Sequence, residues 1–588
     1  MNRLWIFAMA ALGCAAPVPA PLFEANPVTR FQLRPQGTES ARVQLVDVAG
    51  QPFSKAIRIQ TLKRSGSAPA PLVVAPIERE VEAGDIAHAT FWVRTVETTE
   101  PSGEASLSIR YQPPLSPWSH ALNMPAPAKS AWQKFEYPFT IRRSAEKGQA
   151  ELAFTFGPQP QTVEIGGIAI VNYGKSRRIS ELPLTPLGYA GSEPDAPWRK
   201  AARERIEKIR KAGLTVVVKD KDGKRVRNAA VAVRMRKHAF GFGTAVGGPT
   251  LAGVRVAPED LRKYKEHILK LFNWAVMEND LKWPQWSVVA DRPRTLAAVD
   301  WLRENGILVR GLNLIWPSFR NSPAAAREMK DKPEALAKFI LDHMESDAAL
   351  LKGRLVHWDV INETFSNHDF MDILGRQAMV DWFKAARRGD PDVKLYINDF
   401  GIISGNDTAH QNDYAATIHY LNEMGAPLDG IGLQGHFSPR VTPPEEALRR
   451  LDRFAGFKKD LAVTEFDIDT VDERTQADYT RDYLTLTFSH PAIQSFLMWG
   501  FWEGRHWKPN GAMYRTDWSK KPNAEAYESL VLKKWWTNVA GRSDARGAYA
   551  VRGFLGDYDV EVRSGQKSKT LRTSLPAGGT TVECVLDQ

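Results

Sequence analysis

Leu355-Val356-His357-Trp358-Asp359-Val360-Ile361-Asn362-Glu363 is the stretch that decides the fold. It is a short, mostly apolar run that stops at a pair of polar side chains. A second run of this kind, Leu461-Ala462-Val463-Thr464-Glu465, also stops at a glutamate. Short runs that are apolar on both faces are typical of strands in a buried parallel sheet. Both stretches therefore predict parallel strands with a carboxylate at the carboxyl end.

Eight runs of this type lie between residues 240 and 498, and amphipathic helical stretches alternate with them. The strand candidates are 240–245, 272–276, 309–315, 356–361, 395–398, 430–433, 461–464 and 495–498. This alternation indicates repeated βα units, and eight units predict an α/β fold with a closed (β/α)8 barrel. We assign residues 196–535 to this barrel domain, including an initial helix over about 198–212 and a hairpin around the Asp222-Gly223 turn.

Two β-rich regions flank the predicted barrel. Residues 28–172 show a period of two between proline and glycine turns, which predicts a β-sandwich. Residues 173–195 contain repeated glycine and proline and predict a linker. Residues 536–588 alternate again and predict a small β-rich accessory domain, which we expect to pair with the hairpin before the barrel.

Residues 1–20 have the pattern of a secretory signal peptide. Arg3 precedes the apolar run 4–12, which is too short to span a bilayer as a mature anchor. We expect a secreted, extracellular or periplasmic protein, cleaved near Ala15 or Ala20 or carrying a lipid anchor on Cys14. No later segment of the sequence is apolar enough to predict a transmembrane helix.

Composition narrows the range of partners. The formal charge of +10 is spread over 588 residues, and Lys and Arg are interspersed with Asp and Glu, so nucleic acid is not an expected partner. Cys14 and Cys584 are the two cysteines, and loss or lipidation of Cys14 leaves no disulfide. Cys and His are few and do not cluster at ligand spacing, so we expect no metal and no other cofactor. The sequence does not indicate an oligomeric state.

Polar and aromatic residues gather where the predicted strands end. In chain order they are Glu278 and Asn279, Asn313 and Trp316, Asn362 and Glu363, Gln434 and His436, Glu465, and Trp499. The carboxyl ends of barrel strands form one rim, and the active site lies there. Cleavage of a glycosidic bond needs a proton for the leaving oxygen and an anion facing the anomeric carbon. Glu363 and Glu465 can supply both.

Six motifs, in the right order over residues 200–530, resemble glycoside hydrolase family 10, a family of retaining β-1,4-xylanases with a (β/α)8 barrel. His357-Trp358-Asp359-Val360-Ile361-Asn362-Glu363 resembles the acid/base motif, and Val463-Thr464-Glu465-Phe466-Asp467-Ile468 resembles the nucleophile motif. The other similar segments are Phe272-Asn273 with Glu278-Asn279-Asp280-Leu281-Lys282-Trp283, Leu395-Tyr396-Ile397-Asn398-Asp399, Gly430-Ile431-Gly432-Leu433-Gln434-Gly435-His436, and the region 499–507.

The resemblance implies an endo-β-1,4-xylanase that acts on xylan by double displacement, with Glu363 as acid/base and Glu465 as nucleophile. Asn362 would contact the 2-hydroxyl of the sugar, His436 oriented by Asp467 would hold Glu465, and Gln434 would support the same group. The implied substrate-binding residues are Glu278, Asn279, Lys282, Asn313, Trp316, Trp499 and Trp507. In a retaining enzyme the two carboxyl groups lie about 5 to 5.5 Å apart.

The sequence also departs from the family pattern. Leu312 and Pro317 stand where the family usually has histidine, and Phe319 where it has glutamine. Phe400 and Gly401 replace a usual tyrosine and asparagine, while Glu503 and His506 stand where aspartate and serine are common. Three alternatives therefore stay open: a xylanase, a retaining β-glycosidase acting on another β-linked glycan, decorated xylan or aryl glycoside, and a glycan-binding surface protein with little turnover.

The N-terminal sandwich resembles the jelly-roll carbohydrate-binding modules that accompany such enzymes. Trp92, Trp118 and Trp132 are its candidates for stacking on sugar rings. Trp92 and Trp132 lie in strand-like stretches, where a core position is the competing interpretation.

Overall fold

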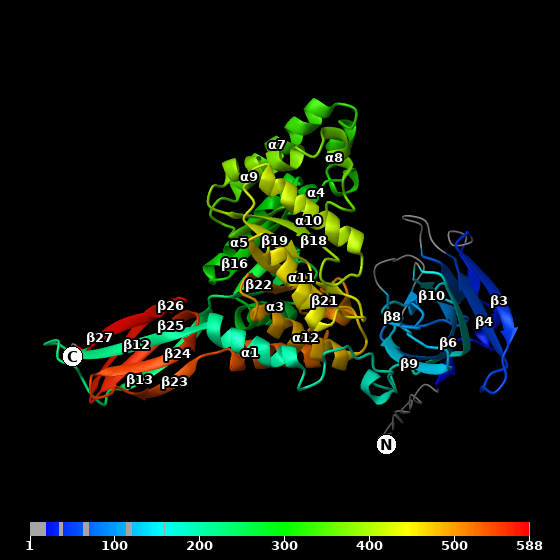
Figure 1. Cartoon of the computed structure of the whole chain (residues 1–588), viewed down its shortest axis with the longest axis horizontal. Helices are drawn as coiled ribbons and strands as arrows, with labels where there is room; N and C mark the ends of the chain where they lie inside the picture. Colours follow the sequence, from blue (N-terminus) through cyan, green and yellow to red (C-terminus); the bar gives the residue numbers. More distant parts are fainter. Residues whose placement is uncertain are drawn as a thin grey trace, which may run out of the picture. The chain divides into compact units, whose positions relative to one another are not determined.

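The computed structural model describes residues 19–34, 39–62, 70–100, 102–112, 120–157 and 159–586 (Figure 1). The chain divides into two compact units, Met1–Leu187 with Thr470–Asp472 and Gly188–Asp469 with Glu473–Gln588. Residues 1–18 of the predicted signal peptide, which include Cys14, and Trp118 lie outside the described residues.

The second unit contains a closed barrel of eight parallel strands. They are β14 (Gly241–Val246), β15 (Trp274–Met277), β16 (Leu308–Ile315), β17 (His357–Asn362), β18 (Lys394–Asp399), β19 (Gly430–Leu433), β21 (Asp460–Ile468) and β22 (Ile493–Met498). The pairing of β19 with β21 and of β22 with β14 closes the ring, and the short β20 (His436–Phe437) pairs with β21. The predicted (β/α)8 fold is confirmed, and each predicted strand coincides with one of these.

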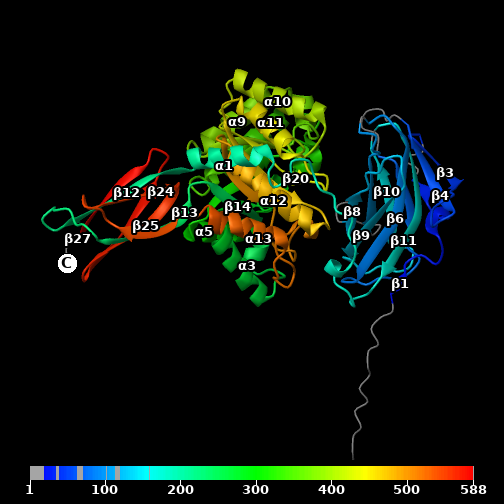
Figure 2. The same ribbon diagram turned by 60° about the horizontal axis from the view of Figure 1, so that its bottom comes forward.

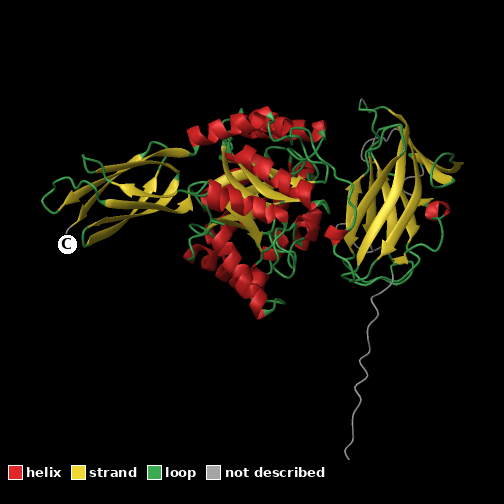
Figure 3. Ribbon diagram, turned by 90° about the horizontal axis from the view of Figure 1, so that it is seen from below, coloured by secondary structure: helices red, strands yellow, loops and turns green. Residues whose placement is uncertain are grey.

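Helices surround the strands of the barrel (Figures 2 and 3). They are α1 (Pro197–Ile209), α2 (Gly248–Leu251), α3 (Pro258–Leu271), α4 (Trp283–Trp286), α5 (Arg292–Glu304), α6 (Ala324–Glu328), α7 (Pro333–Leu350), α8 (Asp369–Leu374), α9 (Ala378–Gly389), α10 (Thr408–Glu423), α11 (Pro444–Ala455), α12 (Glu473–Phe488) and α13 (Pro522–Ser529). Their apolar faces and the strands share one continuous core. Among the described residues, no helix is both long and apolar enough to span a membrane.

The first unit is built from two antiparallel sheets (Figure 3). One sheet contains β1 (Ala20–Pro21), β3 (Ala41–Asp47), β4 (Lys55–Thr61), β6 (Ile86–Thr98), β9 (Gln133–Thr140) and β11 (Gln161–Asn172). The other contains β2 (Gln32–Leu33), β5 (Leu72–Pro76), β7 (Leu107–Gln112), β8 (Leu122–Pro125) and β10 (Glu151–Phe156). The alternating apolar side chains of both sheets form a shared core, as the period of two predicts.

The C-terminal strands form a small accessory module with two strands that precede the barrel. In one sheet β12 (Lys211–Asp220) lies between β24 (Ala548–Phe554) and β27 (Thr580–Leu586). In the other, β13 (Ala230–His238) lies between β23 (Asn538–Arg542) and β25 (Gly556–Ser564), and β26 (Lys567–Leu575) follows β25. The module is therefore assembled from chain segments that the barrel separates.

Two local expectations before the barrel are wrong. The turn at Gly223 forms, with φ of +77°, but only one bridge, Lys219 to Arg225, joins the two arms, and β12 and β13 belong to different sheets. The initial helix ends at Ile209 and not near residue 212, because residues 211–217 pair with β24. Distant strand pairing overrides the local turn and helix signals in both cases.

Candidate active site

Glu363 directly follows β17 in a strained backbone conformation. Its φ is +58°, in the left-handed region that costs a non-glycine residue about 1–3 kcal/mol. Asn367 holds this turn, because its side-chain amide and its backbone N–H both donate to the Glu363 carbonyl, at 3.2 and 3.1 Å. The turn fixes where the Glu363 side chain leaves the end of the strand.

Three side chains donate hydrogen bonds to the Glu363 carboxyl group. Gln434 Nε2 donates to Oε1 at 2.9 Å, Trp316 Nε1 donates to Oε2 at 3.1 Å, and Asn362 Nδ2 reaches Oε1 at 3.3 Å. Burial nevertheless raises the pKa of Glu363 to about 7, with the charges of Asp399 and Glu465 adding to the rise and Gln434 opposing it. A carboxyl group with this pKa can hold a proton near neutral pH and release it.

The Glu465 carboxylate has a different environment. Asn398 Nδ2 donates to its Oε1 at 2.8 Å, and His436 Nε2 lies 3.1 Å from its Oε2. The other nitrogen of His436, Nδ1, lies 3.0 Å from Asp467 Oδ1. Burial alone would lower the pKa of His436, but Asp467 and Glu465 outweigh it and raise that pKa to about 9. A protonated His436, held by Asp467, therefore lies directly against the Glu465 carboxylate.

Asp467 holds His436 and Trp507 in place through hydrogen bonds. Burial raises its pKa, but the charge and hydrogen bond of His436 outweigh burial and bring it down to about 2. Its second oxygen, Oδ2, accepts a hydrogen bond of 2.6 Å from Trp507 Nε1. Asp467 thus fixes both a histidine and a tryptophan at the rim.

Asn398, at the end of β18, is a site residue that the sequence-based list lacks. Its amide nitrogen also donates to Asn362 Oδ1 at 3.1 Å, and its oxygen accepts from Thr464 Oγ1 at 2.8 Å. It therefore connects Asn362 beside the first glutamate with Glu465. The rule that found the other residues, a polar side chain where an apolar strand ends, applies to Asn398 as well.

We expect Asn398→Ala to lower kcat/KM by about 10- to 100-fold, because a hydrogen bond to a charged group contributes about 1.5–3 kcal/mol. Steady-state kinetics would measure the loss, and thermal unfolding would show whether the fold is kept. Thr464→Val is the matched control, since it removes a donor to Asn398 but none to Glu465. Equal losses in the two variants would contradict a direct role for Asn398.

The predicted substrate-binding residues from β15 and β16 lie together. Lys282 Nζ donates to Asn279 Oδ1 at 2.9 Å and lies 5.3 Å from the Trp316 ring centroid. Burial raises the pKa of Glu278, and Lys282 opposes this rise. Asn313 is buried, and its Nδ2 has no hydrogen-bond partner among the described residues. This side of the rim therefore carries several polar side chains.

The two remaining tryptophans differ in exposure. Trp499 is buried and meets the His436 ring edge-on at 5.8 Å, whereas Trp507 is exposed and its ring lies 4.9 Å from His436. Lys508 Nζ lies over the Trp507 ring at 4.2 Å. The Trp507 ring is thus accessible, whereas Trp499 packs in a buried cluster with Leu312 and Leu497.

The three departures in and after β16, at Leu312, Pro317 and Phe319, are apolar side chains. Leu312 is buried in a cluster with Ala245, Val276, Leu497 and Trp499. Pro317 is buried, and Phe319 packs edge-on against Phe370 of α8 at 5.1 Å. None of these three side chains can donate a hydrogen bond to a sugar hydroxyl.

A family model described as "Glycosyl hydrolase family 10" matches residues 232–531, which is more than half of the chain. The chain belongs to glycosyl hydrolase family 10. Its matched region contains the barrel and all thirteen predicted site residues. The family 10 match confirms the resemblance that the six motifs indicate.

Individual relatives cover part of this family 10 chain. The anti-sigma-I factor RsgI6 of Acetivibrio thermocellus is 33% identical over 382 residues, covering 63% of this chain and 47% of the relative. Endo-1,4-beta-xylanase 1 of Arabidopsis thaliana is 29% identical over 380 residues, covering 64% and 39%. The structure of xylanase 10B from Thermotoga petrophila RKU-1 in complex with xylobiose is 26% identical, with a TM-score of 0.46. The match covers 50% of this chain and 95% of the xylanase chain. The chain spans less than half of the length of these two sequence relatives.

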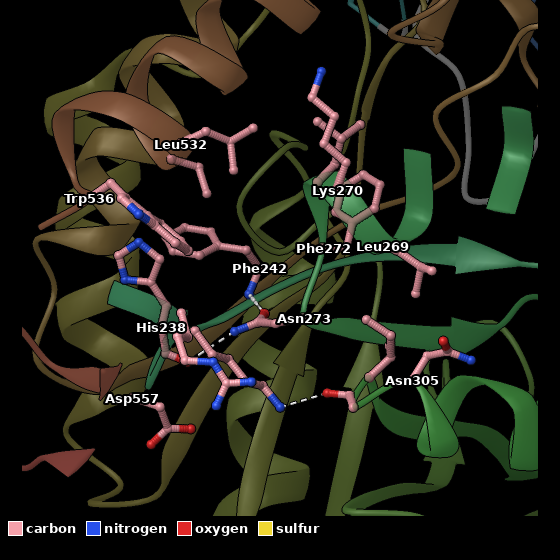
Figure 4. Close-up of a pocket in the computed structure, with 16 residues that line it drawn as sticks. His238, Phe242, Leu269, Lys270, Phe272, Asn273, Asn305, Leu532, Trp536 and Asp557 are labelled. Atoms are coloured by element: carbon pink, nitrogen blue, oxygen red, sulfur yellow. Dashed lines mark hydrogen bonds between the residues drawn. The ribbon is translucent and has the colours of Figure 1, made fainter. Parts of the chain in front are cut away.

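A separate cavity of about 280 Å³ lies at the opposite ends of the strands (Figure 4). Its lining includes His238 at the end of β13, Phe242 near the start of β14, Asn273 before β15, and Trp536 and Asp557 from the accessory module. Asn273 holds the wall together, since its Nδ2 donates to the His238 and Phe240 carbonyls at 3.0 Å. The cavity contains none of the predicted site residues, and this end of a barrel generally serves stability.

Proposed function

We propose that this protein is a retaining β-glycosidase, an endo-β-1,4-xylanase that hydrolyses internal bonds of xylan by double displacement. The observation that carries the proposal is the unequal environment of two glutamates on one rim. Burial keeps the pKa of Glu363 near 7, whereas Glu465 lies against a histidine whose pKa is about 9. Two glutamates on one rim, one of them with a raised pKa and the other in contact with a charged histidine, can divide into an acid and a nucleophile.

In the first step, Glu363 would give its proton to the leaving oxygen while Glu465 attacks the anomeric carbon. This forms a covalent glycosyl-enzyme and releases the first product. In the second step, ionised Glu363 would take a proton from water, which attacks the same carbon and restores both glutamates. The hydrogen bond from Gln434 Nε2 to Glu363 supports this cycle, because it favours the ionised state that the second step needs.

Xylan is the substrate we propose, and the apolar side chains of Leu312, Pro317 and Phe319 leave other β-linked glycans, decorated xylan and aryl glycosides as alternatives. The direct test is the release of reducing ends from glucuronoxylan, arabinoxylan and mixed-linkage glucan by the purified protein. Release from a xylan with initial β-configured products, read by NMR, supports the proposal. Binding without release would favour a glycan-binding protein with little turnover.

The pH dependence follows from Glu363. Since the acid must be protonated in the free enzyme, kcat/KM should fall about tenfold per pH unit above about 7. In Gln434→Ala, the lost donor no longer stabilises the ionised carboxylate, so the pKa of Glu363 rises and the alkaline limb moves to higher pH. Initial rates on phenyl xylobioside, whose weakly acidic leaving group needs a proton, between pH 5 and 10 measure the alkaline limb in the wild type and in the variant. A shift to lower pH in the variant would contradict this assignment.

We also propose that the N-terminal sandwich binds glycan. Trp92 and Trp132 are half-buried, lie outside the sandwich core, and contact Phe53 at ring distances of 6.3 and 5.1 Å on one face of the larger sheet. Aromatic rings on an open sheet face suit stacking against sugar rings. We expect Trp132→Ala to weaken retention of the full chain on insoluble xylan by several-fold, measured by depletion, while hydrolysis of a short xyloside stays unchanged.

Export from the cytoplasm is a further proposal, and it rests on the apolar run after Arg3. Processing near Ala15 or Ala20, or lipid attachment at Cys14, would appear in the intact mass of the protein recovered from its producing cells. The unprocessed mass alone would contradict export.

A further inference from the structure

Two exposed phenylalanines stand beside the proposed acid/base. Phe365 lies two residues after Glu363 and is 38% exposed, and Phe400 follows β18 directly and is 36% exposed. A ligand that covered these two large apolar side chains would gain free energy by removing their surface from water. Because both rings directly follow strand ends of the catalytic rim, substrate is the ligand that would cover them.

A buried histidine holds both rings in place. The His410 ring stacks on Phe365 at 4.4 Å with an interplanar angle of 14°, and meets Phe400 edge-on at 4.8 Å. His410 Nε2 lies 3.0 Å from Asp399 Oδ1, and Asp399 is fully buried. The rings are therefore fixed before any ligand arrives, which lowers the entropy cost of binding.

The order of strands around the barrel indicates whether these rings face the glycone or the leaving group of the substrate. Lys282 and Trp316 follow β15 and β16, Glu363 follows β17, and Phe400 follows β18. Glu363 thus separates the polar groups near Lys282 from the two phenylalanines. A bond protonated by Glu363, with its glycone on the Lys282 side, has its leaving group on the side of the rings.

This side is poor in groups that suit a sugar. Phe400 has no hydroxyl, Gly401 has no side chain, and His410 Nε2 is occupied by Asp399 Oδ1. A hydroxyl-rich leaving group gains few hydrogen bonds there, while a flat aromatic group can stack on or edge against both rings. We propose that the leaving-group side of the site recognises an aromatic aglycone, such as a phenol joined to the sugar chain. This inference rests on the proposed glycosidase function.

The test compares two xylobiosides with equal glycones. One carries phenol, and the other a fluorinated secondary alcohol of similar acidity that has no ring, so that chemical reactivity is matched. We expect wild-type kcat/KM to be about 10-fold higher for the phenyl compound, as two ring contacts of about 0.5–1.5 kcal/mol each would give. In Phe365→Ala/Phe400→Ala the ratio should fall to near one.

Four controls distinguish loss of aglycone recognition from loss of the fold. Phe400→Tyr keeps the ring and should keep the ratio, and Leu350→Ala removes an exposed apolar side chain elsewhere and should leave it unchanged. Thermal unfolding reports whether the double variant folds, and Phe365→Leu tests ring loss with bulk retained. Equal wild-type rates on both xylobiosides, or an unchanged ratio in the folded variants, would overturn this proposal alone. Hydrolysis of neither compound would overturn the glycosidase proposal and this one with it.

Discussion

Glu465→Ala should lower the hydrolysis of xylan by roughly 10⁴- to 10⁶-fold, the scale seen when a nucleophile is removed from a working site. The reason is that no other group can form the covalent intermediate at that position, while His436 would keep its positive charge through Asp467. Release of reducing ends measures the loss. Glu423→Ala, which removes an exposed carboxylate of α10 paired with His419, is the control and should retain full activity.

Rescue by a small anion tests directly whether Glu465 is the nucleophile. In Glu465→Ala the space left by the carboxylate can admit azide, which would attack an aryl xylobioside directly and invert the configuration. We therefore expect an α-configured glycosyl azide and partial recovery of rate. A β-configured azide product, or activity within tenfold of wild type, would show that Glu465 is not the nucleophile.

Glu363→Ala should lower xylan hydrolysis by about 10²- to 10⁴-fold, the usual contribution of a general acid. The loss should depend on the leaving group, because an acidic phenol departs without a proton whereas a sugar hydroxyl does not. With a dinitrophenyl xylobioside we expect a burst of phenol followed by slow turnover, since water then lacks its base. Azide should accelerate this turnover and give a β-configured product.

The pH profile supplies an independent control for Glu363. The limb near pH 7 belongs to its carboxyl group, so it should vanish in Glu363→Ala. Equal rate losses for the sugar and dinitrophenyl leaving groups, or an alkaline limb that survives in the variant, would assign the acid to another residue.

The barrel could be predicted from the sequence because its signals are local. Each strand is a short apolar run, and the polar side chains at its carboxyl end follow within a few residues, as at Asn362 and Glu465. A barrel brings all such ends to one rim by symmetry, so the site could be assembled without coordinates. The pattern of β17 and β21 thus indicated both the fold and its candidate chemistry.

Pairings between strands that are distant in the chain could not be predicted from the sequence. The partners of β12 are β24 and β27, more than three hundred residues later, and the Asp222-Gly223 turn carries no information about them. Asn398 likewise connects to Glu465 and Asn362 only when three strands meet. Local patterns cannot rank such contacts, because their free energy depends on what the rest of the chain brings near.

The sequence by itself determined the barrel, its rim and the two glutamates, since periodicity and strand ends are properties of neighbouring residues. Tertiary structure alone decided which groups surround each glutamate. The pKa of Glu363 rises through burial, that of His436 through two carboxylates from β21, and the rings of Phe365 and Phe400 are fixed by His410 of α10. Burial and charge act through space, and only the folded chain sets those distances.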